Sequence, residues 1–431
     1  GGGGGADRGP PARSWAGAAG GDGGGAGGFG VPFRDRHYAA VQIVGESWPV
    51  VCRQWFVDRV AELARHAGMA PPAEDSAEFA ALVARIGDEC GPGTGPYVLQ
   101  NRPGGPSSWR RGEELTLVRN DRSWRRHERP GTWNFEGIRF RFLDTAAAFN
   151  ALLRGELDWY TTPGIDQLLR SRPELETSFR RIDYDYRQLG VLRVIWNCAR
   201  PPFDDPRVRR ALTMLFDVGR IVEVFGGHCP PARAFAKPDS AAYPAVEPLP
   251  FDVGAARAAL RELGYGPELD RPLPLSLLAP EGPEPMRRTL DLFADAARRA
   301  GVDLDLRVRE WTQFVAEKTR EQWDGLLVLQ GFRSWGDPYD FVHSDGTDND
   351  GHWSDAEVDR LAAAARTELD AARRDELWRQ LHERVYHEQP TTFLLHLRVQ
   401  LLLSRRVEAA EPGPLGLSLE RAHVAPQHQR R

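Results

Sequence analysis

A histidine pair beside a glutamate is the first candidate for metal chemistry in this sequence. His382, Glu383 and His387 resemble the zinc-binding pattern H-E-x-x-H, in which histidines four residues apart face one metal ion from the same side of a helix. Here the histidines are five residues apart. At 100° per residue this spacing separates them by about 140° around a helix. We therefore predict no metal site and expect both side chains to face solvent or a polar contact.

The residue patterns that bind phosphate or supply a nucleophile do not occur in the sequence. A nucleotide-hydrolysing loop needs G-x-x-x-x-G-K-[ST], and neither Lys237 nor Lys318 lies in such a context. The glycines of CGPGTGPY (90–97) are wrongly spaced for a dinucleotide site, so we expect a turn that enters a strand. No G-x-S-x-G pattern supports a hydrolase. The cysteines form no C-x-x-C pair, and we expect buried single thiols at Cys52, Cys90, Cys198 and Cys229.

Aromatic side chains are in surplus, and several fall where strands are expected to end. The sequence has 13 tryptophans and 19 phenylalanines. Trp311 lies at an expected junction between a strand and a helix. Phe332, Trp335 and Tyr339 follow the apolar run GLLVLQG. Because α/β sheets place ligands at the carboxyl ends of their strands, and aromatic walls suit small-molecule pockets, we predict a binding pocket at these loops.

Alternating strand and helix patterns between residues 274 and 331 must position these loops. Apolar residues alternate with charged ones in VDLDLRV (302–308), whereas GLLVLQG is apolar throughout, as an inner parallel strand is. Helical spacing near 284–300 and 311–321 separates the strands. The pattern predicts a β-α-β-α-β unit with parallel strands in one sheet and loops at their carboxyl ends.

Capping residues mark further helices around this unit. Asp205, followed by a proline, predicts an amphipathic helix that continues to Phe225. Ser354 and Glu357 are spaced as an S-x-x-E capping box at the start of another helix. The apolar run FLLHLRVQLLL (393–403) predicts one strand.

Composition excludes several classes of protein. The chain has 431 residues and is 41% hydrophobic, which predicts two or three domains. A formal net charge of −5, from 56 basic and 61 acidic side chains, gives no footprint for nucleic-acid binding. The first 30 residues are rich in glycine and lack the features of a secretion signal, so we expect a flexible leader. No run of 18 apolar residues predicts a membrane span.

A series of collinear blocks resembles the family 5 extracellular solute-binding proteins of ABC importers, which include dipeptide and oligopeptide binders. The similarity covers roughly Gly93 to Leu403, in order and with suitable gaps. The blocks are GTGPYVL (93–99), LTLVRNDRSW (115–124), FNALLRGELDW (149–159), IWNCARPPFDDPRVRRALTMLFD (195–217), LRELGYG (260–266), VREWTQF (308–314), GDPYDF (336–341) and WSDAEVDRLAAAARTELDAARRDELW (353–378).

The resemblance implies an α/β fold with two lobes, of the type II periplasmic-binding-protein class that binds peptides. It implies that the lobes close on a solute, which is handed to the permease subunits of an ABC transporter in the periplasm or cell envelope without chemical change. We expect a monomer with no cofactor, no metal and no nucleic-acid partner. The expected division is a leader (1–30), a remnant of lobe I (31–200), lobe II (201–405) and a C-terminal return segment (406–431).

The resemblance also implies roles for individual residues. Trp196 and Asn197 lie near the hinge strand, and Trp311 matches a tryptophan that lines a pocket for ligand side chains. The GDP segment, which contains Asp337, matches a loop that faces the ligand backbone. Together with the aromatic loops, these residues give the candidate ligand-binding set Trp196, Asn197, Trp311, Phe332, Ser334, Trp335, Asp337 and Tyr339.

Two departures from the family pattern affect these expectations. Peptide-binding members hold the ligand's amino terminus with an aspartate at the position of Ser334, so peptide recognition here requires Asp337 or Asp340 to take over. The region that precedes GTGPY in the family has no evident counterpart beyond residues 31–92, so we expect the first lobe to be incomplete.

Three alternatives stay open beside a binder of peptide-like solutes. The first is a binding protein for another solute, such as an oligosaccharide or a metal chelate. The second is a hydrolase on the same scaffold that uses Asp337 and His343 as acid and base, although no nucleophile pattern supports it. The third is a truncated fragment that binds nothing.

Overall fold

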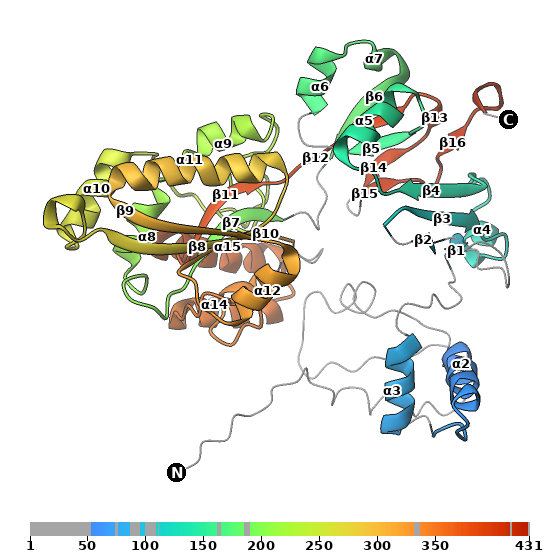
Figure 1. Ribbon diagram of the computed structural model, residues 1–431, viewed down its shortest axis with the longest axis horizontal. Helices are drawn as coiled ribbons and strands as arrows, with labels where there is room; N and C mark the ends of the chain where they lie inside the picture. The colour runs from blue at the N-terminus through green and yellow to red at the C-terminus, as the bar shows by residue number, and fades with distance from the viewer. Residues whose placement is uncertain are drawn as a thin grey trace.

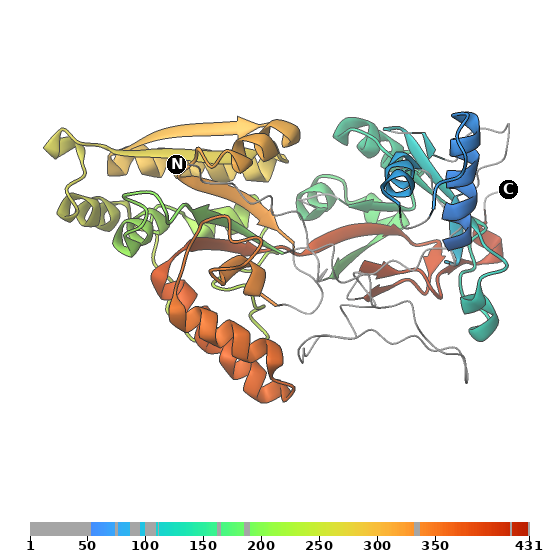
Figure 2. The same cartoon turned by 90° about the horizontal axis from the view of Figure 1, so that it is seen from below.

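Two α/β lobes joined by short crossings form the body of the molecule (Figure 1). The structure is a computed structural model, and it describes residues 53–73, 76–86, 95–99, 109–110, 112–161, 165–184, 190–331, 337–413 and 416–429. In the view of Figure 2, the lobe that contains β7 to β11 lies on the left, and the lobe that contains β3 to β6 lies on the right.

A five-stranded sheet organises the second lobe. Its strand order is β11-β7-β10-β8-β9. β10 and β9 both pair with β8 in parallel, as the β-α-β-α-β pattern predicts, whereas β7 is antiparallel to both β10 and β11. It follows that β8, β9, β10 and β11 all run in one direction. The strands are β7 (Val191–Trp196), β8 (Leu273–Pro280), β9 (Val302–Arg309), β10 (Gly325–Gln330) and β11 (Thr391–His396).

Helices cover both faces of this sheet (Figure 1). The helices on one face are α8 (Pro206–Thr213), α9 (Val218–Val224), α10 (Val253–Glu262) and α11 (Glu284–Ala300). The helices on the other face are α12 (Trp311–Thr319), α13 (Tyr339–Val342), α14 (Ala356–Thr367) and α15 (Ala371–Glu388). A sheet covered in this way needs apolar strands, and every residue of β7 is buried.

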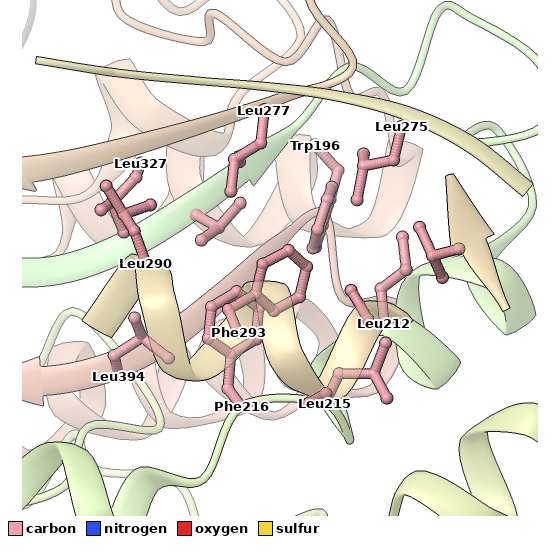
Figure 3. Packing of buried hydrophobic residues seen from close by; sticks show 14 of the residues in the cluster. Trp196, Leu212, Leu215, Phe216, Leu275, Leu277, Leu290, Phe293, Leu327 and Leu394 are labelled. Carbon is pink, nitrogen blue, oxygen red and sulfur yellow. The ribbon is translucent and has the colours of Figure 1, made fainter. Parts of the chain in front are cut away.

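The main core of the lobe lies between the sheet and α8 to α11 (Figure 3). Trp196 is fully buried, and its ring stacks on Phe203 with centroids 6.3 Å apart. Phe216 and Phe293 stack at 4.2 Å. A side chain at Gly351 would put its Cβ 2.5 Å from the backbone oxygen of Trp196, so only glycine lets these segments pack this closely.

Three local expectations need correction. The helix expected from Asp205 to Phe225 is two helices, because a break after α8 lets Asp217 accept a hydrogen bond from Arg220 N and cap α9. The cap of α14 is Asp355 rather than the preceding serine, since its Oδ1 accepts from two backbone amides of the first turn. The expected strand 393–403 is divided between two sheets, as β11 and β12 (Val399–Ser404).

The first lobe is built on smaller sheets. In one sheet, β3 pairs with β1 and β2 on one side and with β4 on the other. In another, β12 lies between β5 and β6. Relative to the expected division at residues 200 and 405, β7 belongs to the sheet of the second lobe and β12 to that of the first. The strands of these sheets are β1 (Tyr97–Leu99), β2 (Trp109–Arg110), β3 (Glu114–Arg119), β4 (Gly137–Arg141), β5 (Trp159–Thr161) and β6 (Phe179–Tyr184).

Short elements complete the described chain. Two short hairpin-like pairs follow β12, with β13 on β16 and β14 on β15. None of the helices in the described ranges is long and apolar enough to cross a membrane. The remaining helices are α2 (Arg53–His66), α3 (Ala77–Ile86), α4 (Trp124–Glu128), α5 (Thr145–Leu153), α6 (Ile165–Ser171) and α7 (Leu175–Ser178), and the remaining strands are β13 (Val407–Glu408), β14 (Glu411–Gly413), β15 (Gly416–Ser418) and β16 (His423–Val424).

Candidate functional site

The carboxyl edge of the five-stranded sheet faces the junction of the two lobes (Figure 1). β8, β9, β10 and β11 all end there, since they run in the same direction. The chain enters the second lobe at this edge, just before Val191, and leaves it after His396. In open α/β sheets, ligands bind outside the carboxyl ends of the strands. We therefore take this edge as the candidate binding site.

Trp311 stands at this edge as an exposed aromatic side chain. It begins α12 directly after β9, and 64% of its surface is exposed. The side chain of Glu310 caps the helix by accepting a 2.8 Å hydrogen bond from Thr312 N, which fixes the first turn. The ring of Trp311 stacks on the buried ring of Phe314, with centroids 5.5 Å apart. The contact with Phe314 thus holds the large apolar ring of Trp311 toward solvent.

Asp337 and Tyr339 form a compact unit with Arg366 of α14. Asp337 Oδ2 accepts a 2.6 Å hydrogen bond from Arg366 Nε, and Oδ1 accepts a 2.9 Å bond from Tyr339 N. Only 1% of the Asp337 side chain is exposed. The Arg366 guanidinium lies 3.7 Å from the centre of the Tyr339 ring, in a cation–π contact. Asp337 therefore organises the loop after β10 and has little surface to offer a solute.

Burial and charge act in opposite directions on Tyr339. Burial raises the pKa of its hydroxyl, while the cation of Arg366 lowers it. The opposite face of the ring belongs to His343, whose ring lies parallel to it at 4.1 Å. The pair considered for acid–base catalysis is not assembled, because Asp337 is paired with Arg366 while His343 Nδ1 accepts from Asp345 N at 3.0 Å.

Asp340 keeps more of its carboxylate accessible than Asp337 does. Its side chain is 37% exposed, and its Oδ1 lies 3.4 Å from Arg366 Nη2. Both aspartates that the sequence offered as replacements for a ligand-binding carboxylate are thus paired with the same arginine. Of the two, only Asp340 has a carboxylate that a solute reaches.

Trp196 and Asn197 lie at the opposite edge of the sheet. β7 is antiparallel to β10, so Trp196 pairs with Gly325 at the start of β10 rather than at its end. The Trp196 indole donates a 2.9 Å hydrogen bond to Thr392 Oγ1 and is fully buried. The Asn197 side chain donates to Trp323 O at 3.2 Å. Trp311 stands at the carboxyl edge directly after β9, whereas Trp196 and Asn197 lie in the core at the other edge. Asp337 and Tyr339 follow β10 in the chain and lie at the start of α13.

The other three candidate residues fall in a segment that the structure does not describe. Phe332, Ser334 and Trp335 lie between residues 332 and 336, outside the described residues. Sequence reasoning missed Arg366, whose role depends on a contact 29 positions away and leaves no local signal. It also missed Arg193, although a single charged residue in the apolar strand VLRVIW is visible in the sequence.

The histidines and cysteines supply no reactive centre in the described part of the chain, where no cluster of three metal-ligating side chains occurs. Of the two surroundings expected for His382, solvent or a polar contact, the structure shows the polar contact. Its side chain is buried, its Nδ1 lies 3.0 Å from Ala242 O, and burial lowers its pKa to about 4. His387 is exposed. Cys229 is buried and Cys198 half-buried, and burial raises the pKa of the Cys198 thiol to about 11, which disfavours the reactive thiolate.

A large cavity lies elsewhere, inside the first lobe. Its walls come from β3, β4, β5, β12 and the C-terminal segment, and its volume is about 2260 Å³. Pockets for small molecules usually measure about 300–1,000 Å³. Phe140 and Phe142 add exposed apolar surface on β4 and just after it. The residues that line the cavity all belong to the first lobe, and its volume exceeds the usual range for a small-molecule pocket.

Comparison with known proteins agrees with this architecture. A family model described as bacterial extracellular solute-binding proteins, family 5 middle, matches residues 84–353. Di/tripeptide-binding protein 2 of Pseudomonas aeruginosa is 28% identical over 332 residues, which are 73% of this chain and 58% of that protein. The probable deoxycholate-binding periplasmic protein YgiS of Escherichia coli is 26% identical over 266 residues, which are 59% of this chain and 48% of that protein. The chain spans about half the length of these curated relatives.

A solved structure supports the same two-lobed fold. The oligopeptide-binding protein AppA of Bacillus subtilis, in complex with a nonapeptide, aligns with a TM-score of 0.67. The alignment covers 83% of this chain and 72% of that one, at 19% sequence identity. At this identity the likeness concerns the fold alone.

Proposed function

Since the chain belongs to the bacterial extracellular solute-binding proteins of family 5, we propose that it is the substrate-binding component of an ABC importer. It binds a peptide-like or other small polar solute between its lobes and delivers it to the permease subunits without altering it chemically. The observation that carries this proposal is the carboxyl edge of the five-stranded sheet, which faces the lobe junction and presents Trp311 and the Tyr339 unit.

Closure of the lobes supplies the affinity in this proposal. A solute that contacts both lobes favours the closed arrangement by its additional contacts, so each lobe contributes to binding. Trp311 provides a flat apolar wall for side chains of the solute. The Tyr339 ring is stacked between Arg366 and His343 and supports the loop after β10. Asp337 holds the loop in place through Arg366.

The site of action follows from the same proposal. The protein works as a monomer in the periplasm or cell envelope, where it meets the solute and its permease. A second candidate is a carrier for a non-peptide solute, because one relative of comparable similarity has a name that refers to deoxycholate.

Thermal denaturation with a solute panel tests both candidates. The panel contains di- to pentapeptides, oligosaccharides, nickel chelates and deoxycholate. A solute at 100 times its Kd stabilises the folded state by about 2.7 kcal/mol, which raises the melting temperature. Stabilisation by peptides supports the first candidate, stabilisation by deoxycholate alone supports the second, and stabilisation by none contradicts the proposed function.

Variants then locate the site. We expect Trp311→Ala to weaken binding of the stabilising solute at least tenfold. The matched control is Trp124→Ala, because Trp124 on α4 of the first lobe is also exposed, at 51% of its surface. The control is expected to change affinity less than twofold. Equal effects of the two variants would place the solute away from the carboxyl edge.

A further inference from the structure

One arginine is buried on the face of the second-lobe sheet that carries α13, α14 and α15. Arg193 is the third residue of β7, and 2% of its surface is exposed. In a strand, alternate side chains share a face, so Val191 and Arg193 point to the opposite side from Trp196. The guanidinium carbon lies 5.0 Å from the centre of the Phe235 ring and 5.4 Å from that of Phe341.

The protein supplies few acceptors to this guanidinium. Nη1 lies 3.4 Å from Thr391 Oγ1 and Nη2 lies 3.4 Å from Gln330 Oε1, both long for hydrogen bonds. Nε has no partner. Arginine has five N–H groups, so three have no acceptor in the described part of the chain. In that part Arg193 forms no ion pair with a carboxylate, although the negative charges of Asp348 and Asp350 act to raise its pKa.

A second buried arginine in the same lobe has all its nitrogens hydrogen-bonded by the protein. Arg209 is also 2% exposed. Its guanidinium donates to backbone oxygens at 2.6–3.2 Å, so each of its nitrogens has at least one close acceptor. These acceptors are the carbonyls of Phe203, Asp204, Glu388 and Gln389. Arg209 therefore links α8 to the end of α15 through hydrogen bonds, whereas Arg193 makes no comparable set of hydrogen bonds between described elements.

The position of Arg193 directs its free N–H groups to the candidate site. Arg193 pairs with Val328 across to β10, and Gln330 is the last residue of that strand. Nη2 reaches Gln330, so this side of the guanidinium lies toward the carboxyl edge, whereas Nη1 reaches Thr391 at the start of β11. Gln330 is half-buried, so a ligand group that passes it meets Nη2 first. The rings of Phe235 and Phe341 pack against the guanidinium in cation–π contacts.

A carboxylate is the chemical group that this arrangement suits. Burial lowers the pKa of Arg193 to about 10, which leaves it charged at neutral pH. A buried cation without a carboxylate partner is unfavourable, and a paired carboxylate removes that penalty. Arginine donates two parallel N–H groups to a carboxylate, which lysine does not do.

We propose that Arg193 is the anchor for a carboxylate of the solute, so that the transported solute carries a free carboxyl group. The inference rests on the proposed function and narrows its substrate class. The same chemistry is available from the carboxyl terminus of a peptide and from another organic acid, and the experiment separates these sources.

Calorimetric titration of the full chain with matched acids and amides is the test. The probes are the dipeptide Ala-Leu and its C-terminal amide, and deoxycholate and its primary amide. We expect one acid to bind at least about thirtyfold more tightly than its amide, since truncating one partner of a buried charge pair has effects of this order. The pair that shows the preference identifies the source of the carboxylate.

Three variants connect this preference with Arg193. Arg193→Met is expected to abolish the preference for the acid. Arg193→Lys keeps the charge but not the forked geometry, and is expected to retain only part of it. Arg288→Met removes an exposed arginine from α11 and is expected to change nothing.

The outcomes separate the inference from the function on which it rests. Equal binding of acid and amide, or a preference that survives in Arg193→Met, overturns the role of Arg193 and leaves solute binding intact. Absence of binding for every acid and amide, together with no stabilisation across the wider panel, overturns the proposed function and this inference with it.

Discussion

Replacing each of the two buried arginines with methionine should change the free energy of unfolding by very different amounts. Arg193 and Arg209 lie in the same lobe and are equally buried. Methionine has a similar length and no charge, so each substitution removes the guanidinium with little change in packing. The two variants therefore compare a satisfied buried cation with an unsatisfied one.

Arg209→Met should be strongly destabilising. The guanidinium makes charged hydrogen bonds to four backbone carbonyls, and its loss leaves buried oxygens without their donor. Each unsatisfied buried acceptor costs about 1–3 kcal/mol, with some recovery by relaxation. Since breaking one side of a buried charged arrangement costs about 3–5 kcal/mol, we expect a loss in that range.

Arg193→Met should be close to neutral at neutral pH. Its pKa falls from the ordinary 12.5 to about 10 on burial, and at 1.36 kcal/mol per pKa unit the charged form is disfavoured by about 3 kcal/mol. This penalty is present at every pH below about 10 and is relieved between about 10 and 12.5. Against it stand two cation–π contacts of about 0.5–2 kcal/mol each. The net expectation lies between a gain of about 2 kcal/mol and a loss of about 1 kcal/mol in the stability of the variant.

Urea denaturation at pH 7, followed by far-ultraviolet circular dichroism, measures both effects. The midpoints of the same transition are compared at a shared slope, because a changed slope indicates altered compactness or an intermediate. Arg288→Met serves as the control for loss of one positive charge. A loss of 3 kcal/mol or more in Arg193→Met would refute the reasoning, because the guanidinium would then stabilise the fold as Arg209 does.

Three further predictions concern stability. Burial holds the pKa of His382 at about 4, below its ordinary 6.5. The contribution of the neutral side chain to the free energy of unfolding is therefore fully present above about pH 6.5, and about 3 kcal/mol of it is lost as the pH falls to 4. His382→Asn should remove this part of the acid destabilisation, as measured by urea titrations repeated across pH. Gly351→Ala should lower stability by at least about 1–3 kcal/mol in urea unfolding, since its Cβ would lie 2.5 Å from Trp196 O, and an unchanged midpoint would contradict the packing. Asp337→Asn should cost about 3–5 kcal/mol by the same assay because it leaves Arg366 without its buried partner, and Arg366→Met in the same background should recover part of the loss.

The parallel unit of the second lobe was predictable because its signals are local. β9 alternates apolar and charged residues, and β10 is apolar up to its last residue, Gln330. α11 between β8 and β9 begins at Glu284 and ends at Ala300, where helical spacing placed it. Gly301 then adopts a positive φ of 85° and ends the helix. Each of these features depends on neighbours within a few positions.

The misplaced boundaries depended on contacts that sequence does not show. The run 393–403 was predicted as one strand, although His396 and Arg398 interrupt its apolar residues where the chain leaves β7 and joins β5 and β6. The helix expected up to Phe225 has suitable spacing across the break after α8, and only the cap at Asp217 signals a second start. Periodicity identifies which face is buried, but not which element covers it.

The sequence and the structure differ most in the sign of the charge that they offer to the solute. The sequence directed attention to carboxylates, because Ser334 replaces an aspartate and Asp337 stands close by. The structure commits both oxygens of Asp337 to Arg366 and Tyr339. Among the described residues near the carboxyl edge, the buried charge without a protein counter-ion is a cation rather than a carboxylate. Arg193 was passed over because its strand is otherwise apolar, and that apolar setting is what makes its charge costly unless a solute compensates it.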